Sequence, residues 1–341
     1  MVNELVLRAA TAVLIVSFAL WVALSVAVLA GRAQYDRRLR TGARQLSRRA
    51  VDRLLRRALG RPRTDWGRWR RITAINRLAA VRHPAMPHML YHALWHSDAE
   101  VAAAAIRVLG RLGDTWAMEL LVAALRDGRV PRSRVAAQLE RLGPEPTYLL
   151  LPLLRDPDPA VRFWAATLIG PNEAVGGPDL VELTRDDDPN VRAAAVEALA
   201  SRRGDDVVQA ALDSLDDAAW FVRVHAARTA GHVGGAAAAP QVANLLTDER
   251  WWVRTAAKDA LETIGQDAVP ALVAMLGSDD QFGRNGAAEV LQDIGLVDHL
   301  AVEEPKSPLL ARIYAAGGQR FKEAAEARTR RAVRAGEERA A

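Results

Sequence analysis

The stretch "DDDPNVRAAAVEAL", residues 186–199, contains the pattern that decides the fold. Asp188 is a residue type that caps helix N-termini, and Pro189 suits the first helical position because the amide of that position has no partner within the helix. Apolar residues then follow at three- and four-residue spacing, as on the buried face of a helix. The stretch therefore predicts a helix that begins at an acidic turn.

An arginine in this pattern returns at nearly constant intervals. The steps between successive copies are 30, 31, 31 and 30 residues, and alanines follow each copy. Extrapolation toward the N-terminus reaches Arg132, Ala102 and Arg71, which makes about eight units between residues 66 and 296. Self-similarity at a fixed period indicates a repeat architecture. The five arginines are Arg162, Arg192, Arg223, Arg254 and Arg284.

Each unit is predicted to contain two helices. "AVPALVAML", residues 268–276, is an example of the first helix, and the helix that carries the arginine is the second. Sustained alternation with period two is absent from the sequence, so we expect an all-α chain without a sheet. Glycines suited to helix C-termini close most of the units. They are Gly113, Gly143, Gly234, Gly265 and Gly295.

These units resemble the short HEAT-like repeats of bacterial proteins, which also occur in phycobilisome lyases. The resemblance covers about two thirds of the chain and implies an α-solenoid of stacked helix pairs with an extended concave face. In such a stack we expect the five repeat arginines and the aspartates that precede them to form a hydrogen-bonded ladder. A role for these arginines in ligand binding is the alternative.

Residues 9–30 form an uncharged, mostly apolar run of 22, which is long enough to cross a bilayer. A buried helix and a signal peptide cleaved before Gly31 are the alternatives. Small residues recur every fourth position along the run, so the span is also expected to pack against a partner helix, unless the spacing is chance in an alanine-rich chain. These residues are Ala19, Ala23, Ala27 and Gly31. The predicted fold is an α-solenoid of about eight 30-residue HEAT-like helix pairs preceded by one transmembrane helix.

Charge is distributed unevenly along the chain. Residues 32–71 contain 15 arginines and three aspartates, whereas residues 72–341 carry a net charge of −7. Because positive charge stays on the cytoplasmic side, we expect a single-pass protein of the bacterial inner membrane with its N-terminus outside and its solenoid in the cytosol. The acidic solenoid disfavours nucleic-acid binding.

The basic segment, residues 32–63, has apolar residues at helical spacing. It is predicted to be an amphipathic helix that lies on anionic lipid headgroups, with a solvated linker helix as the alternative. The predicted domains are therefore a membrane helix at 1–31, a basic helix or linker at 32–65, the solenoid at 66–300, and a charged C-terminal helix or tail at 301–341.

The sequence contains few residues arranged for catalysis. It has no P-loop, nucleophile elbow or zinc-protease motif, no cysteine, and no His-Glu pair of the kind that holds iron in HEAT-repeat hydroxylases. His88, His92 and His96 share a helix face, but three ligands at this spacing spread over about 10 Å, too far for one metal ion. We therefore predict a protein that is not an enzyme and has no cofactor. An enzyme built on the HEAT fold, either a lyase or metal-dependent, is the alternative.

Aromatic residues occupy two neighbouring positions in the later units. They lie two or three residues before the repeat arginine, where earlier units have Pro159, Ala160, Pro189 and Asn190, so the fold does not require them. Equivalent positions stack side by side in a solenoid, and we expect these residues to form one strip that docks a protein partner. Packing between repeats is the alternative. The residues are Trp220, Phe221, Trp251, Trp252 and Phe282.

Two stretches resemble a narrower group of bacterial proteins. "WWVRTAAKDAL", residues 251–261, and "DDQFGRNGAAEVL", residues 279–291, are similar to segments of membrane-anchored HEAT-repeat proteins that accompany family-2 membrane glycosyltransferases. The resemblance implies a scaffold or adaptor whose partner is an integral membrane enzyme such as a glycosyltransferase. An adaptor for a soluble signalling protein is the alternative.

Overall fold

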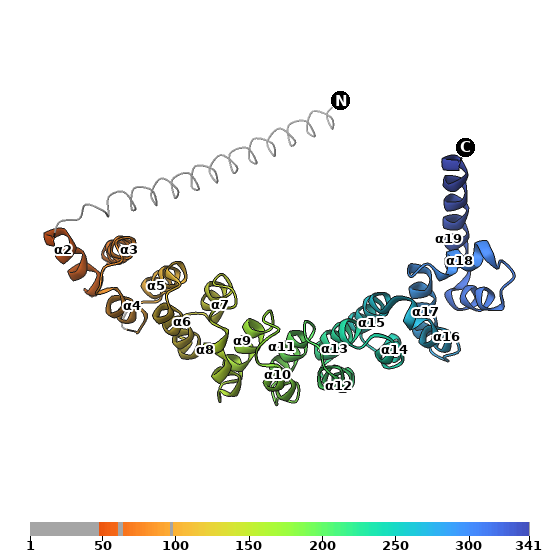
Figure 1. The fold of residues 1–341 in the computed structure, drawn as a ribbon, viewed down its shortest axis with the longest axis horizontal. Helices are drawn as coiled ribbons and strands as arrows, with labels where there is room; N and C mark the ends of the chain where they lie inside the picture. The colour runs from red at the N-terminus through yellow and green to blue at the C-terminus, as the bar shows by residue number, and fades with distance from the viewer. Residues whose placement is uncertain (1–47, 61–63, 96–97, 341) are drawn as a thin grey trace, which may run out of the picture. The chain divides into compact units, whose positions relative to one another are not determined.

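The computed structural model describes residues 48–60, 64–95 and 98–340, and every regular element in these ranges is a helix (Figure 1). The chain divides into two compact units, residues 1–141 and 142–341. The predicted membrane span, with Ala19, Ala23, Ala27 and Gly31, lies outside the described residues. Among the helices that are described, none combines the length and the apolar character of a membrane span.

The first unit consists of three helix pairs. In the first pair, Leu54 and Ala58 of α2 are buried, and α2 packs against both α3 and α4. Arg71 joins the pair, because its Nε donates to the carbonyl of Ala58 at 2.7 Å. The predicted boundary between residues 65 and 66 falls in the first turn of α3, which packs against α2. The helices are α2 (Arg48–Leu59), α3 (Asp65–Ala80), α4 (Met86–Trp95), α5 (Ala99–Leu112), α6 (Thr115–Asp127) and α7 (Arg132–Glu140).

The second unit contains five further pairs arranged in two layers. The second helices, α9, α11, α13, α15 and α17, follow one another along one side, and the first helices α10, α12, α14 and α16 line the other (Figure 1). The second helices span Pro159–Ile169, Pro189–Leu199, Trp220–Val233, Trp251–Ile264 and Gln281–Asp293. The first helices are α8 (Thr147–Leu150) with η1 (Leu151–Arg155), α10 (Gly177–Leu183), α12 (Asp205–Asp213) with η2 (Ser214–Asp216), α14 (Gly235–Asn244) with η3 (Leu245–Thr247), and α16 (Val269–Met275), which follows η4 (Gly265–Ala268).

The repeated sequence positions form the core between these layers. The alanine three residues after each repeat arginine is fully buried in all five second helices, and so is the valine before the arginine in the first four. The fifth helix has Gly283 in place of the valine. A Cβ at that glycine would lie 2.8 Å from Thr247 and 2.9 Å from Met275, so α17 approaches its neighbours more closely than the other second helices could with valine. The alanines are Ala165, Ala195, Ala226, Ala257 and Ala287.

The helix ends follow the expected capping chemistry with one exception. Asp188 accepts hydrogen bonds from backbone amides in the first turn of α11, which confirms it as an N-cap, and Asp158 caps α9 in the same way. Gly113 ends α5 in the left-handed conformation, as predicted. Gly234 does not, because its φ of −94° is right-handed and the positive φ falls on Gly235 instead.

Two helices follow α17: α18 (Leu296–Glu303), which crosses the predicted boundary between residues 300 and 301, and α19 (Pro308–Ala340). Leu310 and Ile313 are buried where α19 packs against α17 and α18. Helix α19 is kinked at Gly318, whose φ of 78° is outside the helical range. The first part of α19 therefore covers the end of the repeat stack.

Candidate functional site

Three repeat arginines each join two successive units of the second domain. Nε and NH2 of Arg162 donate to the two carboxylate oxygens of Asp186 at 2.7 and 2.8 Å, while its NH1 donates to the carbonyl of Asp156 at 2.8 Å. Arg192 binds Asp217 and Arg223 binds Asp248 with the same pattern, at 2.7 to 3.1 Å. The carboxylates are almost fully buried. This set of bonds, here called the arginine ladder, holds neighbouring repeats together.

Two aspartates of the arginine ladder, Asp186 and Asp217, have pKa values lowered by their surroundings. Burial alone would raise the pKa of Asp186, but hydrogen bonds from Arg162 and from the Asp188 amide outweigh it, and the pKa lies below its ordinary value. The same balance, with Arg192 and the Ala219 amide as donors, lowers the pKa of Asp217. The Arg162–Asp186 and Arg192–Asp217 pairs are therefore charged, bidentate and shielded from water, the form in which such pairs are strongest.

The arginine ladder does not continue to Arg254 and Arg284 as predicted. NH1 of Arg254 donates to the carbonyl of Asp248 at 2.7 Å, like the NH1 groups before it, but Ser278 occupies the position of the next aspartate. The Arg254 guanidinium instead lies over the ring of Phe282, 4.3 Å from its centre. Arg284, in the last repeat, has NH1 bonded to the carbonyl of Ser278 at 2.7 Å. Neither arginine pairs with a carboxylate among the described residues.

The predicted aromatic strip, Trp220, Phe221, Trp251, Trp252 and Phe282, lies at the N-terminal ends of α13, α15 and α17. Trp251, Trp252 and Phe282 are 55%, 61% and 59% exposed, Trp220 is 39% exposed, and Phe221 is half-buried. Rings contact each other within a unit, with centres 5.8 Å apart for Trp220 and Phe221 and 4.6 Å apart for Trp251 and Trp252. Large apolar side chains thus face solvent in three successive repeats.

A buried arginine that periodicity could not reveal joins α9 to α11. Arg202 is 4% exposed, and its NH2 donates to the carbonyls of Asn172 and Val175 at 2.8 and 2.9 Å. Its NH1 donates to the carbonyls of Gly170 and Ala198. Burial lowers the pKa of Arg202, with Glu173 opposing that effect. The other units have no arginine at this position, so the repeat pattern gave no signal for it.

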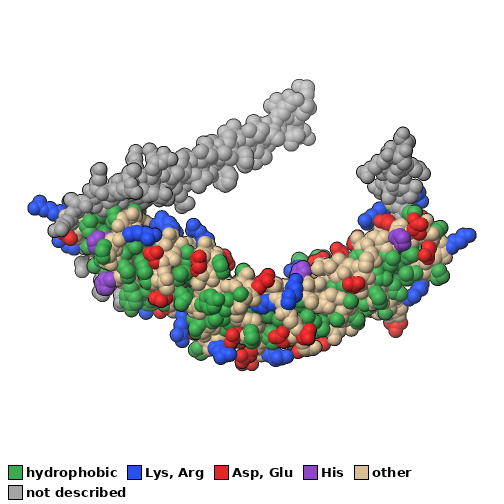
Figure 2. Space-filling view, viewed as in Figure 1, with side chains coloured by type: hydrophobic (Ala, Val, Ile, Leu, Met, Phe, Trp, Pro, Cys, Tyr) green, Lys and Arg blue, Asp and Glu red, His purple; other side chains and the backbone are tan. Residues whose placement is uncertain are grey.

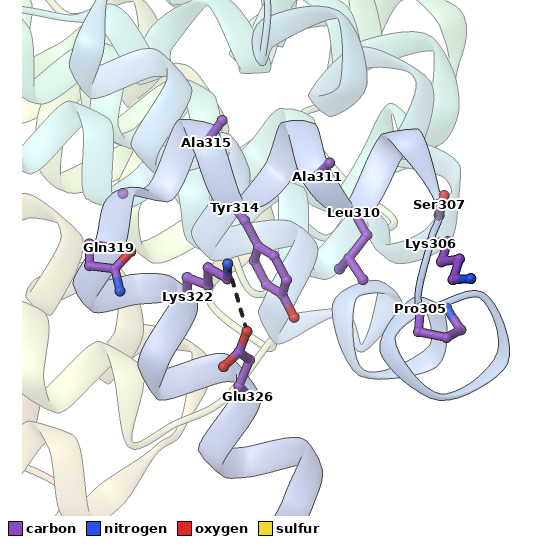
Figure 3. A pocket seen from close by; sticks show the side chains of 11 residues that line it. Pro305, Lys306, Ser307, Leu310, Ala311, Tyr314, Ala315, Gln319, Lys322 and Glu326 are labelled. Carbon is purple, nitrogen blue, oxygen red and sulfur yellow. Dashed lines mark ion pairs between the residues drawn. The ribbon is translucent and has the colours of Figure 1, made fainter.

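A pocket lies at α19 (Figure 3). Its volume is about 610 Å³, and it is lined by the turn before α19 and by both sides of the kink. Lys322 faces Tyr314, with Nζ 5.8 Å from the ring centre, and pairs with Glu326 at 4.0 Å. Burial raises the pKa of Tyr314, and Glu326 and Asp298 add to that effect. No feature of the sequence predicted this pocket.

The predicted histidine face contains no metal-binding group among the described residues. His88 is exposed, and Nδ1 of His92 lies 3.2 Å from NH2 of Arg71, while His96 is outside the described ranges. No cluster of three or more potential metal ligands occurs in the described part of the chain. The face of the molecule in Figure 2 shows acidic and basic side chains interspersed along the second unit, without a continuous basic stripe of the kind that duplex binding requires.

Comparison with known proteins identifies the repeats. HEAT repeats are matched at residues 146–226, 177–262 and 209–292. A search of curated protein sequences found no significant match. Similar solved structures include human deoxyhypusine hydroxylase in complex with glycerol, at 21% identity and a TM-score of 0.30, covering 72% of this chain and 96% of that one. An engineered protein matches at 20% identity and a TM-score of 0.42, covering 84% of this chain and 95% of that one. The matched repeats and the stacked helix pairs show that the chain is a HEAT-repeat protein with an α-solenoid fold.

Proposed function

We propose that this protein is a non-enzymatic, membrane-anchored scaffold that binds a protein partner through the aromatic strip of its solenoid. HEAT-repeat solenoids generally serve as protein-interaction scaffolds, because stacked repeats present extended binding surfaces. The observation that carries the proposal is the exposure of Trp220, Trp251, Trp252 and Phe282 at equivalent positions of three repeats. Tryptophan is enriched at binding hot spots, and earlier units fold without aromatics at these positions.

The candidate partner is an integral membrane glycosyltransferase of family 2. Support comes from the resemblance of residues 251–261 and 279–291 to membrane-anchored HEAT-repeat proteins that accompany such enzymes. Those two stretches contain three of the four exposed aromatic residues, so the resemblance and the exposed surface coincide. The mixed charge of the second unit on the face in Figure 2 also favours a protein partner over a nucleic acid.

Membrane attachment through residues 9–30 is part of the proposal, and the first helix pair supports it. Arginines occupy the exposed face of α2, and the stacked rings of Trp66 and Trp69 in α3 are 63% and 54% exposed. Because α3 and α4 cover the apolar stripe of α2, the arginines and tryptophans are the groups that would meet lipid. Tryptophan favours the headgroup level of a bilayer, and arginine is attracted to anionic lipids.

The test of partner binding is the double variant Trp220→Ala with Trp251→Ala in the full chain. We expect its melting temperature to stay near that of the wild type, because both rings are exposed. We expect the variant to recover less of a co-expressed family-2 glycosyltransferase from mild detergent. The binding free energy should weaken by about 2 kcal/mol, which is a loss of roughly 30-fold in affinity.

The matched control is Tyr148→Ala, which removes an aromatic ring that is 69% exposed in the same unit but outside the strip. Its recovery of the enzyme should equal that of the wild type. A double variant that melts far lower would instead assign the two tryptophans to the core. Equal recovery by all three proteins would remove the aromatic strip from partner binding.

A further inference from the structure

The arginine ladder contains three examples of one carboxylate-binding arrangement. In each, NH1 is bonded to carbonyl oxygens six and five residues back, which holds the guanidinium in place. The opposite edge, formed by Nε and NH2, then binds both oxygens of an aspartate in the next unit. The geometry is that of bidentate recognition, which arginine performs and lysine does not.

Arg254 has the first half of this arrangement without the second. Its NH1 donates to the carbonyls of Asp248 and Glu249 at 2.7 and 3.2 Å, as in the three complete pairs. Ser278 replaces the aspartate, and the Ser278 hydroxyl accepts from the amide of Asp280 at 3.1 Å. No carboxylate among the described residues pairs with Arg254, so its Nε–NH2 edge is held in the binding orientation and left open.

The surroundings of this edge differ from those of the complete pairs. The guanidinium carbon of Arg254 lies over the ring of Phe282, 4.3 Å from its centre, so an aromatic ring and not a carboxylate is the group recorded next to this arginine. Trp251 and Trp252, one turn earlier on α15, are both exposed. The open edge is thus part of the aromatic strip.

We propose that Arg254 is the binding site for an acidic side chain, an aspartate or glutamate, of the protein partner. The partner's carboxylate would take the place that Asp186, Asp217 and Asp248 take in the complete pairs, with Phe282 stacked on the arginine beneath it. Aromatic residues around a shielded charge pair form the typical composition of a binding hot spot. This inference rests on the proposed function and names the chemistry that the partner must present.

The decisive variant is Ser278→Asp in the full chain. It restores the aspartate of the repeat in a context, Asp-Asp-Asp, that the chain already uses at residues 186–188. We expect the new carboxylate to bind Arg254 internally, which raises the melting temperature and blocks the site. The probes are the peptide acetyl-Gly-Asp-Gly-amide and its Asn counterpart, followed through the Nε–Hε NMR signal of Arg254 in ¹⁵N-arginine-labelled protein.

In the wild type, the Asp peptide should shift this signal saturably and the Asn peptide should not. In Ser278→Asp the response should fall about tenfold or more, equivalent to about 1.4 kcal/mol. The variant Arg254→Lys assigns the signal and removes the bidentate edge without removing the charge, so it should also lose the response. It provides the same test if Ser278→Asp does not fold.

Three results would overturn the inference: equal response to both peptides, a response at Arg284 in place of Arg254, or an undiminished response in Ser278→Asp. The proposed function fails separately. If the Asp peptide binds at Arg254 but the tryptophan variants keep full partner recovery, the proposal that the tryptophans bind the partner is wrong and the carboxylate site at Arg254 stands. If the tryptophan variants lose the partner but the peptide does not bind, only the assignment of a carboxylate to Arg254 is wrong.

Discussion

Arg192 of one repeat and Asp217 of the next form a bidentate ion pair at 2.7 and 2.9 Å, and their side chains are only 18% and 10% exposed. The pair joins residues 25 positions apart in the chain, and NH1 of Arg192 also donates to the carbonyl of Asp186, six positions before it. The link between repeats is therefore polar as well as apolar.

Arg192→Ala should lower the melting temperature while the helix content below the transition stays the same. The variant leaves Asp217 shielded without its partner, which costs roughly 3 kcal/mol, somewhat less than a fully buried pair because some water reaches it. Circular dichroism on heating measures the effect. Arg185→Ala is the control, since its pair with Asp213 is 65% and 43% exposed and should contribute about 1 kcal/mol or less. Full stability with lost partner binding would instead make Arg192 a ligand contact.

Acid should destabilise the solenoid through Asp186 and Asp217 of the arginine ladder. The pKa values of Asp186 and Asp217 lie below the ordinary value of about 4 in the folded state, since hydrogen bonds from Arg162 and Arg192 outweigh the opposing effect of burial. As the pH falls, the unfolded chain takes up these protons first, so the stabilisation is complete above pH 4 and disappears as the pH falls through the folded-state values. Melting temperatures between pH 6 and pH 3 measure this decline. It should be shallower in Asp217→Asn, and an equal slope in that variant would assign the acid sensitivity to other groups.

Arg202→Met should destabilise the second unit without affecting the aromatic strip. The substitution keeps the apolar stem and removes the donors that the carbonyls of Asn172, Val175 and Gly170 share. Each unsatisfied carbonyl costs about 1 kcal/mol or more, so a loss of roughly 3 kcal/mol is expected in chemical denaturation. Arg203→Met, at the exposed neighbouring position, should be nearly neutral. Similar stability of the two variants would show that water replaces Arg202 at these carbonyls.

The proposed topology can be checked because the chain contains no cysteine. A cysteine at position 2 should react with an impermeant thiol reagent on intact cells, and one at position 336 should react only after permeabilisation. The expectation follows from the 15 arginines between residues 32 and 71, which keep that side of the span in the cytoplasm. Labelling at 336 but not at 2 in intact cells would reverse the orientation.

Local chemistry made the repeat predictable from sequence. Asp188 specifies where a helix begins through bonds from amides two and three positions away, Pro189 suits the first helical position, and alanines at helical spacing specify the buried face. Such contacts join residues that are close in the sequence. The period of about 30, the two-helix units and the all-α class could therefore be predicted from the sequence. The same holds for the aspartates beside each repeat arginine, and for the positions of the aromatic residues.

Contacts between repeats were decided only by the tertiary structure. Whether Trp251 faces solvent or a neighbouring helix depends on how successive helix pairs stack, which no single repeat encodes. Arg202 does not recur in the other repeats, so the sequence pattern could not predict that it donates to the carbonyls of Asn172 and Val175 in the preceding unit. Ser278 lies six residues before its repeat arginine, at the position that Asp186, Asp217 and Asp248 occupy in the units before it. Only the ion pairs made by those aspartates show that a carboxylate at this position binds the arginine of the preceding repeat. Sequence periodicity specifies each helix pair, but the geometry between pairs depends on packing across the interface, and that geometry determines which side chains remain open to a partner.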